Sequence, residues 1–257
     1  MVLHGFGCSW TQGEGADSKF ESTLKNEDLN QFRNEHSWLK HLANKIGIDC
    51  RNNGSSGNSN SNIFNKIVLD ITDGIIKADD LVIIMWSSSL RDSVTFLPKG
   101  EWVSWSVKHL IQSPEKFVNS FKNDDSVYTE FIMKYKNFFV SELFNQNYYN
   151  IVNQNYIVFV QKLLNHYGIK YIMCDSFEPM LIDLHKKDDV IHTIDKSTYW
   201  GFRKQTFRDF LNKTNRLDIW EHQDTKYNTR ATQHPNKEGY KLISQELYNY
   251  IVKNNII

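Results

Sequence analysis

The chain has 257 residues, of which 40% are hydrophobic and 23% are charged, so it can bury the core of a globular protein. Thirty basic residues balance thirty acidic ones, which leaves no overall field to attract nucleic acid or an anionic membrane. The N-terminal residues do not have the pattern of a signal peptide. No apolar run approaches the roughly 18 residues of a membrane helix, so we expect a cytoplasmic protein.

The first predicted element is a buried strand, because residues 2–6 form an apolar run that ends at Gly7. Ser9 follows two residues later. Its hydroxyl is therefore expected at the end of a sheet, where a nucleophilic serine would stand on a rigid turn. The polar residues from there to about residue 34 predict a long loop with some helical turns.

The next segment has the order of an α/β unit. Residues 35–46 place their apolar side chains on one helical face, and Gly47 is a natural stop. A short strand at 48–51 follows, then a Gly/Ser/Asn-rich loop at 52–62 and an apolar helix at 63–76.

Residues 81–86 are the clearest predicted strand, because they are continuously apolar, as strands covered on both faces of a parallel sheet are. Ser87, Ser88 and Ser89 come directly after it. Beyond an irregular stretch at 92–122, the pattern predicts helices at 127–143, 149–167, 201–212 and 236–252 and a strand at 170–174.

Strands that alternate with helices predict a three-layer α/β/α sandwich with a mainly parallel, flavodoxin-like sheet. We expect one domain over residues 1–257, with a helical, aromatic-rich insertion at about 92–150. In such sheets the functional crevice lies at the carboxyl ends of the strands. Ser9, Gly57 and the three serines at 87–89 should therefore share one edge.

Three short blocks stand at strand ends or before the last helix. Residues 7–9 are Gly-Cys-Ser, residues 52–57 are Asn-Asn-Gly-Ser-Ser-Gly, and residues 231–235 are Ala-Thr-Gln-His-Pro. In this order the blocks resemble those of the SGNH (GDSL-like) hydrolases, which are α/β/α serine esterases and acyl hydrolases. The run Gly-Cys-Ser-Trp-Thr followed by Gly-x-Gly resembles a divergent branch of phage and bacterial proteins.

The resemblance implies that Ser9 is the nucleophile and that His234 is its general base. It also implies that the backbone amides of Ser9 and Gly57 face the developing oxyanion, where each donor is worth about 3 kcal/mol. The family adds an asparagine amide from its third block. This chain has Ser87 and Ser88 there, and either one could match.

Other site positions stay open at this stage. Asn58 or Asn60 could replace the missing asparagine. Trp10, Asn58 and Arg91 are candidate substrate contacts, although at Arg91 we favour a salt bridge.

Ala231 stands where the family has the aspartate that orients the histidine, and loss of that orienter costs about 10⁴ in rate in a Ser-His-Asp triad. Asp224 is the first candidate substitute and Glu221 the second. A backbone carbonyl or an unassisted Ser-His dyad are the alternatives.

Rival functions fit the sequence less well. Gly5-x-Gly7 begins a dinucleotide fingerprint, but Trp10 fills its third glycine position. No P-loop, Cys-x-x-Cys or His-Glu-x-x-His motif occurs, so we expect neither a cofactor nor a metal. The serious rival is a catalytically degenerate binding or structural module that uses the aromatic-rich residues 102–156.

The sequence therefore predicts a serine esterase or acyl hydrolase that acts on a small ester or an O-acetylated, carbohydrate-like substrate. No nucleic-acid or membrane partner is expected. The acyl group, the alcohol and the oligomeric state are left open.

Overall fold

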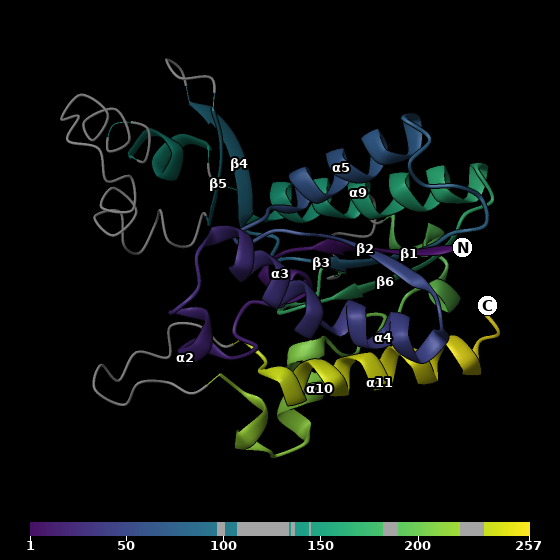
Figure 1. Cartoon of the computed structure of the whole chain (residues 1–257). Helices are drawn as coiled ribbons and strands as arrows, with labels where there is room; N and C mark the ends of the chain where they lie inside the picture. The colour runs from purple at the N-terminus through teal and green to yellow at the C-terminus, as the bar shows by residue number, and fades with distance from the viewer. Residues whose placement is uncertain (97–100, 107–133, 135–136, 144, 182–189, 222–233) are drawn as a thin grey trace.

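The computed structural model describes residues 1–96, 101–106, 134, 137–143, 145–181, 190–221 and 234–257 (Figure 1). At its centre is a four-stranded sheet with the order β2-β1-β3-β6, in which every pairing is parallel. The strands are β1 (Val2–Gly7), β2 (Asp49–Gly54), β3 (Leu81–Trp86) and β6 (Lys170–Asp175). All four predicted strands are present, and β2 extends three residues beyond its predicted end into the Asn52–Gly54 segment expected to be a loop.

Helices cover both faces of this sheet (Figure 1). One face carries α5 (Asn60–Thr72) and α9 (Gln146–His166), and the other carries α4 (Trp38–Ile46), α10 (Phe207–Lys213) and α11 (Lys237–Lys253). The predicted three-layer α/β/α sandwich is confirmed. Within the part of the chain that the structure describes, no helix is long and apolar enough to cross a bilayer.

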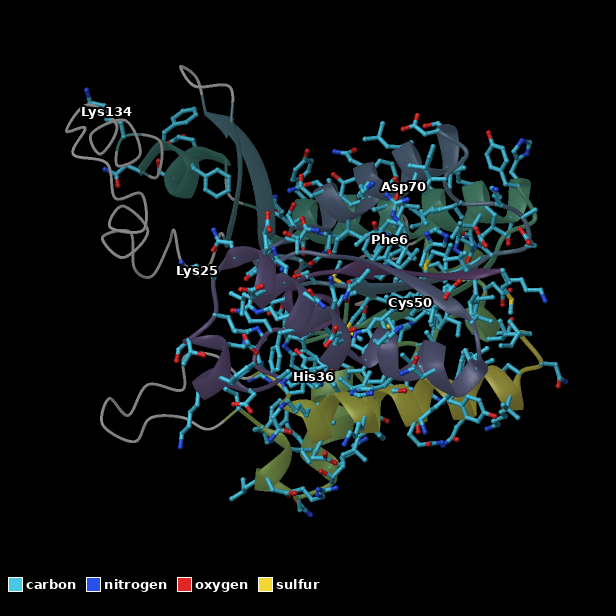
Figure 2. All side chains as sticks on the ribbon, in the orientation of Figure 1. Phe6, Lys25, His36, Cys50, Asp70 and Lys134 are labelled. Atoms are coloured by element: carbon cyan, nitrogen blue, oxygen red, sulfur yellow. The ribbon has the colours of Figure 1, made fainter. Side chains whose placement is uncertain are left out.

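The core consists of two apolar layers, one on each side of the sheet (Figure 2). Successive side chains of a strand point to opposite faces. Val82 and Ile84 of β3 therefore pack toward α5 and α9, whereas Ile83 and Met85 pack toward α4 and α11. Because both faces of β3 are covered, each of its six residues is buried, which explains its unbroken apolar sequence.

Helix caps fix where the flanking helices begin and end. The Ser37 side chain accepts a hydrogen bond from the Lys40 N–H at the start of α4, and Gly47 ends that helix with a φ of 81°. The Asn236 side chain accepts hydrogen bonds from the first turn of α11. These caps lie close to the predicted helix ends.

The polar region after Ser9 differs from the predicted loop, because it contains α3 (Asn26–His36). None of the α3 residues is buried, so the helix has no apolar stripe by which the sequence could reveal it. The helix predicted from Gly201 begins at Phe207 instead, since Thr206 and Asp209 form a capping box there. The shorter helices are α1 (Ser9–Gln12), α2 (Ser18–Glu21) and the 3₁₀ turns Ile191–Thr193, Lys196–Thr198 and Leu217–Ile219.

The proposed insertion opens with an antiparallel hairpin, β4 (Arg91–Phe96) and β5 (Glu101–Ser106), which is separate from the central sheet. The sequence predicted irregular structure there. One π-helical turn, Phe139–Leu143, lies farther along. Most of the helix predicted at 127–143 falls outside the described residues.

Candidate active site

Ser9 stands at the carboxyl end of β1, where the strand gives way to a helix. Gly7 permits this close turn, because a Cβ there would collide with Thr11 Oγ1 and come within 2.9 Å of the Met85 carbonyl oxygen. Cys8 is the N-cap of α1 and Ser9 is its first residue. The first N–H groups of a helix have no acceptor inside it, so the Ser9 N–H is left for another partner.

His234 reaches Ser9 from the far end of the chain. An antiparallel bridge between Trp220 and Pro235, together with the Asn236 cap of α11, fixes the backbone around it. Its Nε2 lies 2.8 Å from Ser9 Oγ, although the two residues are 225 positions apart. This is the distance that proton transfer between a serine and a histidine requires.

The other ring nitrogen of His234 faces a carboxylate. Glu221 donates its N–H to the His234 carbonyl oxygen at 2.9 Å, and its Oε2 lies 3.7 Å from Nδ1. That separation is longer than a hydrogen bond, and Nδ1 has no hydrogen-bond partner among the described residues. Asp224 and Ala231 lie outside those residues, so Glu221 is the orienter candidate that the structure places.

The loop after β2 lies against the turn that leads to Ser9. The Ser55 N–H and the Asn58 Nδ2 both donate to the Gly7 carbonyl oxygen, each at 3.2 Å. Gly57 lies between them in the exposed part of the loop, with a φ of 73° that favours glycine. The Asn58 amide is thus directed at the backbone.

Asn60 holds the end of β3. Its buried side chain accepts a hydrogen bond from the Ser87 N–H at 2.8 Å and donates to the Ser87 carbonyl oxygen at 3.2 Å and to Asn153 Oδ1 at 2.9 Å. The amide of Asn60 is therefore engaged with the β3 turn, and it does not have the free donor that we considered as an alternative to the missing asparagine.

The hydroxyls of Ser87 and Ser88 have different partners. Ser88 donates its proton to Glu178 Oε1 at 3.1 Å. Ser87 Oγ instead accepts from Arg91 Nη1 at 3.1 Å, which leaves its own proton free to donate. Of the two serines, Ser87 has the chemistry that an oxyanion donor needs.

Arg91 and Trp10 depart from their expected roles. The Arg91 guanidinium lies over the Phe177 ring at 5.1 Å and makes no ion pair within the described part of the chain, so the favoured salt bridge is not found there. Trp10 is fully buried and packs edge-on against Phe177 and Trp220. It presents no surface to a substrate, contrary to the sequence-based expectation.

Glu14 is a further carboxylate at the site that the sequence did not predict, and its Oε2 lies 4.0 Å from His234 Nε2. The glycines on either side of it, Gly13 and Gly15, were the available signal. No group of three or more His, Cys, Asp or Glu side chains that could hold a metal ion occurs among the residues that the structure describes.

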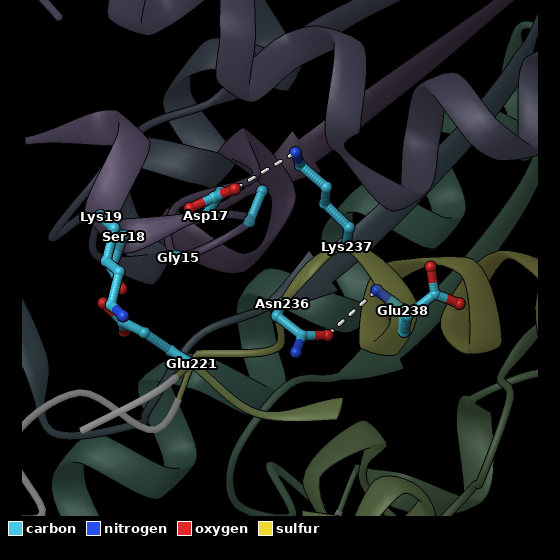
Figure 3. Close-up of a pocket in the computed structure, with 9 residues that line it drawn as sticks. Gly15, Asp17, Ser18, Lys19, Glu221, Asn236, Lys237 and Glu238 are labelled. Carbon is cyan, nitrogen blue, oxygen red and sulfur yellow. Dashed lines mark hydrogen bonds and ion pairs between the residues drawn. The ribbon is translucent and has the colours of Figure 1, made fainter. Parts of the chain in front are cut away.

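A cavity of about 270 Å³ is lined in part by Glu221, whose carboxylate also lies 3.7 Å from His234 Nδ1 (Figure 3). Glu221 and Gly15 form one part of its wall and Asn236 another. Asp17 and Lys237 form an ion pair at 3.4 Å across it. Neither Ser9 nor His234 lines the cavity.

Asp175 is a second titratable group at this edge of the sheet, at the end of β6 and opposite Trp86 of β3. Burial raises its pKa to about 7, although hydrogen bonds from the Tyr199 hydroxyl at 2.6 Å and the Met180 N–H act in the opposite direction. It contacts neither Ser9 nor His234 and belongs to the packing beneath the site.

No protein-family model matches the chain, and no curated protein matches it. Several solved structures are similar to the chain. The psychrotrophic esterase EstA from Pseudoalteromonas sp. is 13% identical, covers 98% of this chain and 97% of its own, and has a TM-score of 0.41. The acetyl xylan esterase AlAXEase is 16% identical, with coverage of 98% and 100% and a TM-score of 0.43.

A member of the lipolytic G-D-S-L family from Veillonella parvula DSM 2008 is 12% identical and covers 98% of this chain and 97% of its own, at a TM-score of 0.36. The neighbours are thus G-D-S-L-type lipolytic proteins and esterases. Identities this low do not assign a family to the chain.

Proposed function

We propose that this protein is a serine ester hydrolase in which Ser9 is the nucleophile and His234 the general base. The single observation that carries the proposal is the 2.8 Å separation of Ser9 Oγ and His234 Nε2 at the carboxyl edge of a parallel sheet. A serine hydroxyl is a weak nucleophile until a neighbouring base accepts its proton, and here the base is within reach.

The reaction has two halves. Ser9 Oγ attacks the ester carbonyl carbon while its proton moves to His234 Nε2, and the resulting imidazolium returns that proton to the leaving alcohol as the C–O bond breaks. Water then attacks the acyl-enzyme and gives its proton to His234 Nε2. The imidazolium passes that proton to Ser9 Oγ as the bond between the acyl group and Ser9 breaks. Glu221, 3.7 Å from Nδ1, favours the imidazolium by its charge.

Three donors are proposed for the oxyanion. They are the N–H of Ser9 at the start of α1, the N–H of Gly57 in the loop held against Gly7, and the hydroxyl of Ser87. A hydroxyl is shorter than the asparagine amide that SGNH hydrolases use. We therefore expect slower turnover than a complete oxyanion hole would give.

The proposed substrate is a small ester or an O-acetylated molecule, including an acetylated carbohydrate. Ser9 is only 3% exposed, so little room surrounds the nucleophile and a short acyl group fits it best. Arg91 is the polar side chain proposed to meet the alcohol portion. The Gly-Cys-Ser-Trp-Thr run supports, within the same proposal, the divergent phage and bacterial branch.

The test is hydrolysis of nitrophenyl acetate by wild-type protein, Ser9→Ala, His234→Asn and the double variant. Each single change should lower kcat by about 10³-fold or more, and the double change should add little, because the pair acts as one unit. Ser22→Ala, at an exposed serine of the α2 end, is the control and should hydrolyse at the wild-type rate. Slow hydrolysis that is equal in wild type and Ser9→Ala would instead favour a binding module.

A further inference from the structure

Glu14 lies on the side of His234 opposite Glu221, so the imidazole stands between two carboxylates. Glu14 Oε2 is 4.0 Å from Nε2, the nitrogen that also contacts Ser9, and Glu221 Oε2 is 3.7 Å from Nδ1. Sequence motifs gave a reason to expect a carboxylate only near Nδ1. The carboxylate near Nε2 therefore needs its own explanation.

The backbone conformation of the Gly13-Glu14-Gly15 loop allows the Glu14 carboxylate to lie close to His234. Both glycines have positive φ, 96° and 86°. A Cβ on Gly13 would collide with the Arg33 carbonyl oxygen, and one on Gly15 would come within 2.5 Å of the His234 Cβ. Only glycine fits this close contact on both sides of Glu14.

Hydrogen bonds tie the same loop to the nucleophile and to α11. The N–H groups of Gly13 and Glu14 both donate to the Ser9 carbonyl oxygen, at 3.0 and 3.1 Å. The Tyr240 hydroxyl of α11 donates to the Glu14 carbonyl oxygen at 2.6 Å. The position of Glu14 is thus fixed relative to Ser9 and to the helix that follows His234.

The Glu14 carboxylate has two neighbours besides His234, one at each oxygen. Ser56 donates its hydroxyl proton to Glu14 Oε2 at 2.6 Å. Arg33 is 3.8 Å from Glu14 Oε1, whereas its close partner is Glu21, at 2.8 Å. The negative charge of Glu14 is therefore directed toward Nε2 of His234, in a site where the two side chains are 24% and 12% exposed.

We propose that Glu14 is a positioning residue that stabilises the imidazolium of His234 during acyl transfer, and that its charge acts from the Nε2 side, whereas Glu221 acts from the Nδ1 side. This inference rests on the proposed function. Glu14 does not accept the proton. The proton passes from Ser9 Oγ to Nε2 and then to the leaving oxygen, while Glu14 lowers the free energy of the charged ring in between.

The first test is the pH dependence of kcat/KM with nitrophenyl acetate for wild type and Glu14→Gln. The carboxylate favours the charged form of the ring, so its removal should move the acid limb toward lower pH and lower the plateau by about tenfold. Glu35→Gln, an exposed α3 residue, makes the same charge change and should leave both unmoved.

Ser56→Ala separates charge from loop structure, because it removes the hydroxyl contact and keeps the Glu14 carboxylate. It should leave most of the acid limb in place. An effect of Ser56→Ala as large as that of Glu14→Gln would overturn the proposal, since it would show that loop structure matters and charge does not.

A second measurement needs no turnover. The pKa of His234 is followed by NMR of the imidazole signals in wild type and Glu14→Gln, with His234→Asn used to assign the signal. The His234 signals of Glu14→Gln should titrate at lower pH than those of wild type, because one carboxylate fewer favours the charged ring. An unchanged pKa would refute the role of Glu14 whether or not the protein hydrolyses esters. If wild type shows no Ser9-dependent hydrolysis but the NMR titration still differs between wild type and Glu14→Gln, the proposed function is refuted and the electrostatic contact is not.

Discussion

Gly15 lies directly against His234, since a Cβ built on Gly15 would come within 2.5 Å of the histidine Cβ and 3.2 Å of Glu221 Oε2. The absence of a side chain at this position is therefore part of how the histidine is held. The loop from α1 and the segment before α11 can approach this closely only with glycine between them.

Gly15→Ala should consequently displace His234 from Ser9 and lower kcat by at least about tenfold, because a misplacement of about 1 Å at a reacting pair is costly. Gly47→Ala is the matched control. Its φ of 81° imposes similar backbone strain, but nothing lies within 4 Å of the added Cβ. It should cost about 1 kcal/mol of stability and leave kcat unchanged. Equal activity of the two variants would show that the contact does not position the histidine.

Glu221→Gln should lower kcat by about tenfold and change KM little, because the carboxylate acts on the charged histidine and not on bound substrate. The loss is expected to be smaller than for a hydrogen-bonded orienter, since Oε2 and Nδ1 are 3.7 Å apart. Glu238→Gln, in the wall of the same cavity but paired with Lys241, should retain wild-type kinetics. A rise in KM alone would argue that Glu221 binds substrate.

Asp175 predicts a pH dependence of stability. Burial raises its pKa from 3.8 to about 7 in the folded protein, so the folded state binds a proton that the unfolded state has released. The contribution is fully present below the unfolded pKa and is lost as pH rises through about 7. It amounts to about 4 kcal/mol over that window.

Urea unfolding of wild type and Asp175→Asn from about pH 5 to about pH 8 measures the part of this contribution that is lost above pH 5, about 3 kcal/mol, as the difference between the two curves. The substitution keeps an oxygen for the Tyr199 hydroxyl. The wild-type free energy of unfolding should fall relative to that of the variant as pH rises. Parallel curves would mean that Asp175 titrates as an ordinary carboxyl.

Much of the architecture was predictable because it follows from apolar periodicity. β3 is buried on both faces and has an unbroken apolar sequence, and α11 carries an apolar stripe. The helix α3 was missed for the same reason: none of its residues is fully buried, and its two apolar side chains, Leu29 and Phe32, are too few to form a stripe. Apolar periodicity therefore reveals only those helices and strands that bury an apolar face.

The candidate site was predictable in part. Ser9, Gly57 and Ser87 were expected at one edge because strand ends converge there, whereas His234 was expected to join Ser9 from the resemblance to the SGNH hydrolases. The burial of Trp10 depends on Phe177 and Trp220, which are far away in sequence. Likewise, the amide of Asn60 is directed by its contacts with β3 and α9. No local pattern contains such long-range contacts.

The central claim is that Ser9 is a nucleophile activated by His234, and labelling with a fluorophosphonate tests it without any choice of substrate. Peptide mass spectrometry of wild-type protein should find the adduct on Ser9. The adduct should be absent from Ser9→Ala and should form much more slowly in His234→Asn, because the hydroxyl then has no base to accept its proton. Wild-type protein that stays unlabelled, or that carries the adduct on a different serine, would contradict the account.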